Sequence, residues 1–249
     1  MELGSGDRLL VTGATGLVGS HVAERANRLG VATRVIVRNP DAATWLSDAG
    51  VEVVAGDMTD SESLCRAVQG VTVVVHCAAK VGDWGPVEDY RDVNVKGLEA
   101  LIDVACENGS LKRFVHISSL GVYAARDHYG TDETEAPDRE GIDGYTLTKV
   151  ESEDLARQRF ADGSFPLVVL RPGFVYGPRD RTVIPRLIQR LATGGFKYLG
   201  SGEQLLNNVY IDNLVDAVFL AISRDDVLGE VFNITDDRLV TKREFIGTI

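Results

Sequence analysis

A glycine-rich turn near the start of the chain constrains the fold more than any other feature. The apolar run at residues 8–11 leads into Thr-Gly-Ala-Thr-Gly-Leu-Val-Gly, residues 12–19, and an amphipathic stretch follows. Here Gly13 permits a tight turn, Gly16 lets the backbone approach a phosphate, and Gly19 lets a helix pack on the strand. Strand, glycines and helix in this order predict a site for a dinucleotide pyrophosphate at the helix N-terminus. The turn residues assigned to this site are Gly13, Thr15, Gly16, Leu17, Val18 and Gly19.

Apolar runs alternate with amphipathic stretches as far as about residue 171. We expect strands at residues 8–11, 33–37, 51–54, 71–76, 113–117 and 167–170, most of them rich in Val and Ile. Helices are expected at residues 17–29, 42–49, 61–68, 90–107 and 145–160. Repeated strand–helix units predict an α/β fold with a doubly wound parallel sheet of the Rossmann type, which binds ligands beyond the carboxyl ends of its strands.

After Arg171 the rhythm changes, because glycine and proline interrupt the sequence and the elements become short. The elements expected here are a helix at residues 212–223 and a strand at residues 230–234. We therefore expect a dinucleotide-binding domain over residues 1–171 and a small substrate lobe over residues 172–249, interleaved with the last Rossmann elements. Thr241 and Glu244 have the spacing of a capping box for one more helix. The sequence ends soon after it, so the lobe is expected to be truncated.

Net charge and cysteine usage exclude several classes of partner. With 37 acidic and 26 basic residues the formal net charge is −11, so the chain lacks the basic excess that binds nucleic acids or anionic membranes. Three scattered cysteines outside any Cys-x-x-Cys pattern argue against a disulfide framework or a zinc site. The first residues lack the basic and apolar regions of a signal peptide. We expect a cytoplasmic protein that binds a small molecule, and no metal, nucleic acid or membrane.

A tyrosine and a lysine lie four residues apart in the helix expected at residues 145–160. At this spacing Tyr145 and Lys149 share one helix face, although such pairs also occur incidentally. A free phenol, with a pKa near 10, is a poor acid–base catalyst at neutral pH, and a nearby ammonium lowers that pKa. The pair therefore indicates a general acid or base. Asn94, in the middle of another expected helix, either points inward and supports Lys149 through water or faces solvent.

Small or polar residues follow several expected strands at the edge where the ligand is predicted. Ser118 and Ser119 follow the fifth strand and offer hydroxyls to a substrate oxygen. Asp57 follows the third strand and can accept a hydrogen bond from adenine, or it forms a turn or a helix cap. Ala78 and Ala79 follow the fourth strand and would let the backbone approach a cofactor.

In this joint order the motifs resemble the extended short-chain dehydrogenase/reductase family. The resemblance is carried by the glycine-rich turn, Gly56-Asp57, residues 76–79, Asn94-Val95-x-Gly97, Ser118-Ser119, Tyr145-x-x-x-Lys149, residues 171–178 and residues 209–212. It implies a nicotinamide cofactor and a catalytic triad of Ser119, Tyr145 and Lys149, supported by Asn94. Ser119 fits better than the serine before it, because a Val-Tyr pair follows three positions later. Tyr145 would be the general acid or base, and Lys149 would lower its pKa and hold the nicotinamide ribose.

The resemblance also implies cofactor contacts beyond the glycine-rich turn. These are Arg38, Asp57, Met58, Ala78, Ala79, Lys80, Tyr145, Lys149, Pro172, Gly173 and Val175. At the end of the second strand an enzyme that uses NAD usually has an acidic residue for the ribose 2′-hydroxyl. This chain has Arg38, which favours NADP because it can pair with a 2′-phosphate, although some family members with arginine here accept NAD.

The candidate substrate contacts are Ser118, Trp84, Arg179 and Arg181. The two arginines would meet an anionic group, and residues 78–85 resemble the branch that contains 3β-hydroxysteroid dehydrogenases and dihydroflavonol reductases. The leading hypothesis is an NAD(P)-dependent oxidoreductase that interconverts a secondary alcohol and a ketone. The alternatives are a nucleotide-sugar epimerase or dehydratase that retains NAD, with the arginines on a pyrophosphate, and a non-catalytic nucleotide-binding sensor. The family often forms homodimers through the helices expected at residues 90–107 and 145–160.

Overall fold

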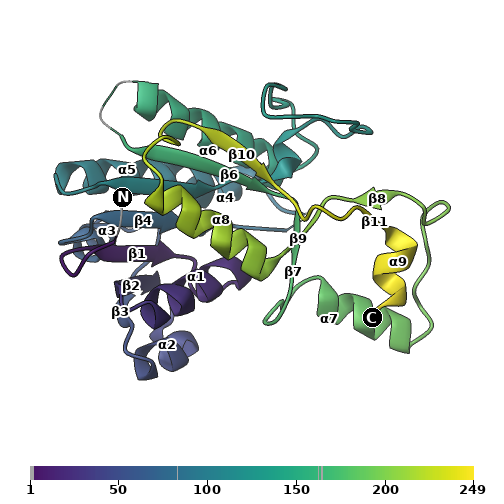
Figure 1. The fold of residues 1–249 in the computed structure, drawn as a ribbon, viewed down its shortest axis with the longest axis horizontal. Coiled ribbons are helices and arrows are strands. Elements are labelled where there is room, and N and C mark those ends of the chain that lie inside the picture. Colours follow the sequence, from purple (N-terminus) through teal and green to yellow (C-terminus); the bar gives the residue numbers. More distant parts are fainter. Residues whose placement is uncertain (1–2, 83, 162, 164) are drawn as a thin grey trace.

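A parallel sheet forms the centre of the molecule (Figure 1). The computed structural model describes residues 3–82, 84–161, 163 and 165–249. Within these residues, seven parallel strands form one sheet in the order β10-β6-β5-β4-β1-β2-β3. Its strands are β1 (Arg8–Thr12), β2 (Ala32–Val37), β3 (Glu52–Ala55), β4 (Val73–His76), β5 (Arg113–Ile117), β6 (Leu167–Pro172) and β10 (Val231–Ile234). The chain winds outward from β1 to β3 and then from β4 to β6, which is the predicted Rossmann order.

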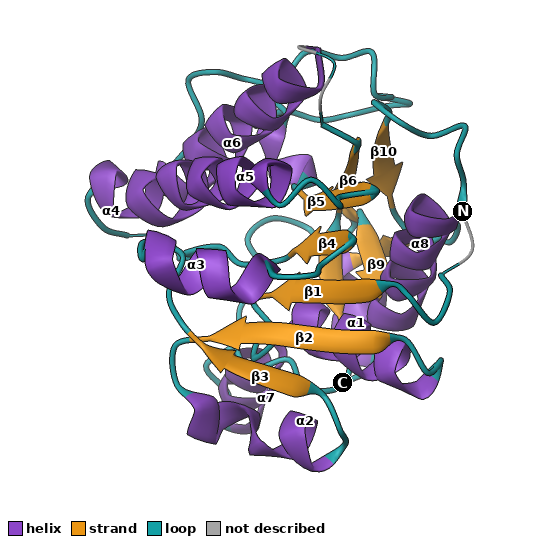
Figure 2. Ribbon diagram, turned by 90° about the vertical axis from the view of Figure 1, so that its left-hand side faces the viewer, coloured by secondary structure: helices purple, strands orange, loops and turns teal. Residues whose placement is uncertain are grey.

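Helices cover both faces of this sheet (Figure 2). One layer contains α1 (Leu17–Arg28), α2 (Thr44–Asp48) and α8 (Ile211–Ser223), and the other contains α3 (Ser61–Val68), α5 (Gly97–Glu107) and α6 (Gly144–Ala161). On β1, Leu9 and Val11 pack into the core of the first layer, whereas Leu10 packs into the core of the second. Burial on both faces explains why the strands appear in the sequence as nearly continuous apolar runs.

Two of the expected helices are divided in the structure. The second one begins earlier, as a 3₁₀ segment η1 (Pro40–Ala43) that precedes α2, because proline has the fixed φ and missing N–H that suit a first helical position. The fourth one also begins earlier, as α4 (Val87–Arg91), and passes through a π-helical segment η2 (Asp92–Lys96) before α5. Such π-helical turns are frequent at functional sites, and this one contains Asn94.

Residues 172–249 contribute both to the sheet and to a small lobe beside it. The lobe contains β7 (Phe174–Tyr176), α7 (Ile184–Ala192), β8 (Leu205–Leu206), β9 (Asn208–Tyr210), β11 (Val240–Thr241) and α9 (Lys242–Gly247). β10 and α8 return to the Rossmann part, where β10 pairs with β6 and α8 packs against α1. Thr241 caps α9 by accepting a hydrogen bond from the Glu244 amide at 3.0 Å. A division of the chain at residue 171 stays a prediction.

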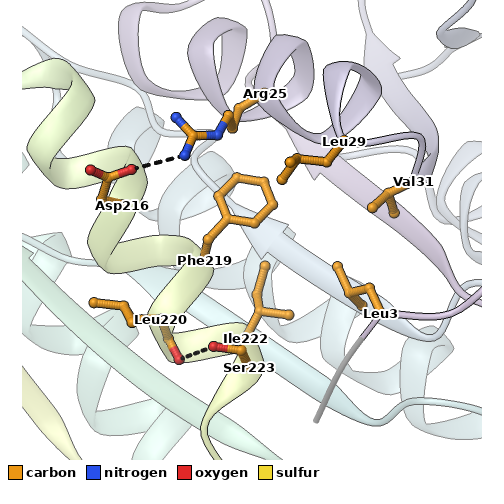
Figure 3. A pocket seen from close by; sticks show the side chains of 9 residues that line it. All are labelled: Leu3, Arg25, Leu29, Val31, Asp216, Phe219, Leu220, Ile222 and Ser223. Carbon is orange, nitrogen blue, oxygen red and sulfur yellow. Dashed lines mark hydrogen bonds and ion pairs between the residues drawn. The ribbon is translucent and has the colours of Figure 1, made fainter.

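A hollow of about 580 Å³ lies between α1 and α8 (Figure 3). It is lined mainly by apolar side chains, among them Leu29, Val31 and Phe219. Arg25 and Asp216, which also line it, form an ion pair at 3.3 Å. Because α1 runs back from the carboxyl edge of the sheet, its last turn lies near the amino edge. The hollow is therefore remote from the edge at which the sequence predicts a ligand.

Substitution of Gly19 by alanine tests the close contact between α1 and the glycine-rich turn. A Cβ atom at Gly19 would lie 2.4 Å from the carbonyl oxygen of Gly13. We expect Gly19→Ala to lower the free energy of unfolding by about 1–3 kcal/mol, because the helix must shift away from the strand. Urea denaturation measures this difference. Gly6→Ala is the control, since nothing lies within 4 Å of its Cβ position, and equal stability of both variants would contradict the close packing.

Candidate active site

The glycine-rich turn joins β1 to α1 at the carboxyl edge of the sheet. Gly13 has a φ of +68°, and a Cβ atom there would lie 2.8 Å from the amide nitrogen of Ala78. Gly16 is the N-cap of α1, and no side chain caps the first amide groups of the helix, which begins at Leu17. Thr15 is exposed at the turn. These amides, together with the helix dipole, form a cradle that fits a pyrophosphate.

Thr12, which the sequence analysis did not select, ties this turn to the segment after β4. Its hydroxyl oxygen accepts hydrogen bonds from the amides of Cys77 at 3.2 Å and Ala78 at 3.0 Å. The same oxygen lies 2.9 Å from Nδ1 of His76, and burial lowers the pKa of His76 to about 3, so this imidazole is neutral. Thr12 thereby fixes the backbone that leads to Ala79. The signal in the sequence was a threonine directly after the first apolar run.

Arg38 and Asp57 follow the neighbouring strands β2 and β3. Oδ1 of Asp57 accepts hydrogen bonds from the amide and the hydroxyl of Thr59 at 2.9 and 2.8 Å, so Asp57 forms the turn that was one of its two expected roles. These bonds and the charge of Arg38 lower the pKa of Asp57. Arg38 itself is exposed. Met58 is buried and packs closely against Gly97 in α5. A Cβ atom added at Gly97 would lie 2.9 Å from the Cβ atom of Met58.

The three predicted catalytic side chains converge between β5 and α6. The hydroxyl oxygen of Ser119 accepts a hydrogen bond from the Gly121 amide at 3.0 Å, and this hydroxyl faces the Tyr145 phenol, whose pKa it lowers. Lys149 is buried, and its Nζ donates to the carbonyl oxygen of Ile117 at 2.7 Å. The structure therefore brings Ser119, rather than the serine before it, into contact with the phenol.

The pKa values at this site differ from the sequence-based expectation. Burial raises the pKa of Tyr145, and the hydrogen bond with Ser119 offsets this rise only in part. Burial also lowers the pKa of Lys149 to about 8. The expected lowering of the Tyr145 pKa by Lys149 is not what the structure has, because the ammonium donates to the Ile117 carbonyl instead. The phenol thus keeps its proton at neutral pH.

Asn94 is buried and points inward, one of the two expected orientations. Its Oδ1 accepts from the Lys80 amide at 2.7 Å, and its Nδ2 donates to the Lys80 carbonyl at 3.1 Å and to the Thr148 hydroxyl at 3.0 Å. It therefore joins the segment after β4 to α6, next to Lys149. The side chain of Lys80 pairs with Asp89 at 2.8 Å, so a cofactor would meet the backbone of Lys80.

A buried ion pair lies behind the triad. Arg171 in β6 and Glu153 in α6 are each 1% exposed, and Nε of Arg171 donates to Oε2 of Glu153 at 3.0 Å. Nη1 of Arg171 also donates to the hydroxyl of Tyr123 at 2.6 Å. Glu153 lies four residues after Lys149, on the same face of α6, and this spacing is the signal in the sequence that points to it.

Ser118 belongs to this buried cluster. Its Oγ donates to Oε2 of Glu153 at 2.9 Å, and the residue is 2% exposed. The prediction that Ser118 contacts a substrate is therefore wrong, because successive residues after a strand point in opposite directions. Ser118 turns inward to the ion pair, whereas Ser119 turns toward the phenol.

The segment after β6 approaches β9 closely. Pro172 is buried at the end of β6, and the Gly173 amide donates to the carbonyl oxygen of Ile234 at 3.0 Å. A Cβ atom at Gly173 would lie 1.9 Å from the carbonyl oxygen of Asn207, so only glycine fits there. Val175 follows in β7, which pairs with β9.

The two candidate arginines do not line a common anion site. Nη2 of Arg179 lies 2.7 Å from Oε2 of Glu24 in α1, and its guanidinium lies 5.0 Å from the ring centroid of Trp45. Arg179 is therefore paired with a carboxylate of this chain, and its contact with an anionic substrate group stays a prediction. Arg181 is exposed and stays a candidate.

Trp84 is presented to solvent from a loop that is itself fixed. Its side chain is 92% exposed, while its backbone carbonyl accepts a hydrogen bond from the Tyr90 hydroxyl at 3.1 Å. The ring of Tyr90 packs against the first residue of α6, where a Cβ atom at Gly144 would lie 2.8 Å away. Tyr90 thus joins the loop of Trp84 to the end of the helix that carries Tyr145.

Over the described ranges, no group of three or more His, Cys, Asp or Glu side chains is arranged to hold a metal ion. None of the helices in the part of the chain that the structure describes is both long and apolar enough to cross a membrane. The three cysteines are free, and burial raises the pKa of Cys77 to about 12.

Comparisons with known proteins agree on one family. The model of the NAD dependent epimerase/dehydratase family matches residues 9–235. The chain is 29% identical to 4-hydroxy-2-methyl-3-oxo-4-farnesyl-3,4-dihydroquinoline-1-oxide ketoreductase of Stigmatella aurantiaca, over 96% of this chain and 71% of that protein. It is 33% identical to 2-alkyl-3-oxoalkanoate reductase of Stenotrophomonas maltophilia, over 97% of this chain and 74% of that protein. A solved structure of a Bacillus cereus UDP-glucuronic acid 4-epimerase variant, in complex with UDP-4-deoxy-4-fluoro-glucuronic acid and NAD, is similar to this chain with a TM-score of 0.86. The identity is 25%, and the match covers 96% of this chain and 81% of the epimerase chain.

Substitution of Glu153 tests the buried ion pair. Glu153→Gln leaves the Arg171 guanidinium buried without a countercharge, so we expect a loss of about 3–5 kcal/mol in the free energy of unfolding. Chemical denaturation measures it. Glu151→Gln, two residues away on α6, is the matched control, because its pair with Arg91 at 2.7 Å is partly exposed and contributes far less. A similar small loss in the free energy of unfolding from both variants would show that the buried pair contributes no more stability than the partly exposed one.

Proposed function

The chain belongs to the NAD-dependent epimerase/dehydratase family and is an enzyme, and on this premise we propose that it interconverts a secondary alcohol and a ketone with a nicotinamide dinucleotide. The observation that carries this proposal is the contact of Ser119 with Tyr145, one helix turn before Lys149, at the carboxyl edge of the sheet. The two curated relatives described above are a ketoreductase and an oxoalkanoate reductase, which supports chemistry at a ketone.

Each side chain of the triad has one task in this reaction. The Ser119 hydroxyl holds the substrate oxygen next to the phenol of Tyr145. Because burial raises its pKa, Tyr145 is protonated at neutral pH and can give its proton to the ketone oxygen as the alcohol forms. Lys149, held one helix turn from Tyr145 by the Ile117 carbonyl, is the proposed contact for the nicotinamide ribose. When bound, the dinucleotide would supply the hydride for the carbonyl carbon.

NADP is the proposed cofactor, held between the glycine-rich turn, the segment of Ala78 and the exposed guanidinium of Arg38. That guanidinium follows β2, where it can form a bidentate pair with a 2′-phosphate. The solved relative contains NAD, which supports a nicotinamide dinucleotide in general. The preference for NADP depends on Arg38.

A nucleotide-sugar epimerase that retains NAD is the second candidate, favoured by the similarity to the Bacillus cereus epimerase. Such an enzyme needs cations for the pyrophosphate of its substrate. Arg179 was a candidate for this role, but Glu24 already pairs with it at 2.7 Å. This pairing makes the ketone reductase the better supported function.

Trp84, exposed beside the start of α6, is the proposed apolar contact for the substrate of this ketone reductase.

Replacement of Tyr145 by phenylalanine tests the proposed proton donor. We expect Tyr145→Phe to lower kcat for reduction of a 3-oxo ester by about 10²–10⁴-fold, because the ring stays in place and only the acidic proton is lost. Oxidation of NADPH, followed by absorbance, measures the rate. Tyr129→Phe is the matched control, since Tyr129 is 89% exposed and outside the triad. Undiminished turnover by Tyr145→Phe would refute the mechanism.

Substitution of Arg38 tests the cofactor preference. Arg38→Ala is expected to weaken NADPH binding by about tenfold or more, the usual weight of a charge-assisted hydrogen bond, and to leave NADH binding unchanged. Isothermal titration of both dinucleotides measures the two affinities. Arg190→Ala, an exposed arginine in α7, controls for the loss of one positive charge. Equal weakening of NADPH and NADH would contradict a 2′-phosphate contact.

A further inference from the structure

The segment that follows β6 crosses the ligand edge of the sheet. In the order β6-β5-β4-β1, the ends of β6 and β1 are three strands apart, and at about 4.8 Å per strand the span is roughly 14 Å. The crossing segment, residues 173–180, runs from the end of β6 to α1, where Arg179 pairs with Glu24, and β7 within it lies beside β9 next to the sheet (Figure 1). The carboxyl ends of the strands along this span are followed by the glycine-rich turn after β1, Ala78 after β4 and Ser119 after β5.

Arg179 fixes the far end of the crossing segment. Its Nη2 lies 2.7 Å from Oε2 of Glu24 in α1, and its guanidinium lies 5.0 Å from the ring centroid of Trp45 in α2. The hydrogen bond from Arg179 lowers the pKa of Glu24, so the pair is ionised at neutral pH. The segment that starts at the catalytic end of the sheet is thus anchored to the two helices next to β1 and β2.

The backbone at this anchor is strained. Among the residues that the structure describes, Arg179 is the non-glycine residue with a positive φ, at +69°, a conformation that a side chain with a Cβ atom rarely adopts. The residues on either side of Arg179 are closely packed or hydrogen-bonded. A Cβ atom at Gly177 would lie 2.4 Å from Cγ2 of Ile211, and Asp180 accepts from the amides of Thr182 at 2.7 Å and Ile184 at 3.0 Å.

We propose that Arg179 is a latch that closes the crossing segment over the bound dinucleotide and slows its release. The inference rests on the proposed function, because it requires a dinucleotide at the strand ends beneath the segment. A reductase must exchange its cofactor in every turnover, and a latch made of one partly exposed ion pair and one ring contact is weak enough to open. Strain at Arg179 favours opening further. Since Asp180 caps α7, opening also loosens the substrate lobe.

The rate of NADPH release tests the latch. The purified chain is loaded with NADPH and mixed with excess NADP⁺ in a stopped-flow instrument, and the fluorescence of the reduced nicotinamide is followed. Arg179→Met is expected to release NADPH about three- to tenfold faster than the wild type. Arg186→Met, an exposed arginine in α7, is the control and is expected to release it at the wild-type rate.

A double-mutant cycle separates the latch from a general loosening of the fold. Glu24→Gln alone is expected to speed release, and the double variant with Arg179→Met is expected to be little faster than Arg179→Met, because the two residues act as one pair. Additive effects, or wild-type release rates in variants that still bind NADPH, would overturn the latch. Failure of the wild type to bind either NADPH or NADH would overturn the proposed function and the latch with it.

Discussion

The buried ion pair of Arg171 and Glu153 is the interaction on which the geometry of the site depends. Two charges withdrawn from water are stable only when each satisfies the other, so the pair fixes α6 against β6. The same carboxylate holds Ser118 at the end of β5. Tyr145 and Lys149 on α6 are thereby set against Ser119. A shift of α6 that would misplace the proton donor would also separate the charges.

Local patterns in the sequence were sufficient to predict the fold and the family. The doubly wound sheet and the family membership are confirmed, and α3 and β5 have the expected bounds, residues 61–68 and 113–117. These predictions depended on apolar periodicity and glycine spacing, which are properties of neighbouring residues. The glycine-rich turn is the clearest case, since the contact between Gly19 and Gly13 that explains it also lies within the motif.

Contacts between distant residues were beyond such patterns. The motif favoured Ser119 over Ser118 for catalysis, but it did not show that Glu153, 35 residues after Ser118, buries the Ser118 hydroxyl. Arg179 was expected to serve the substrate, but its partner Glu24 is 155 residues away. The pKa of Tyr145 depends on burial within the assembled site, which no spacing rule reports. The roles of the site residues therefore stay predictions until they are tested.

The identity of the dinucleotide that the protein carries tests the central claim most directly. The purified chain is incubated with isotopically labelled NADP⁺, washed and denatured, and the released nucleotide is identified by mass spectrometry. A reductase that exchanges its cofactor at the Arg38 site is expected to release labelled NADP⁺. Stoichiometric unlabelled NAD⁺ that survives the exchange would contradict this account, because it would indicate an epimerase that keeps its cofactor throughout the reaction.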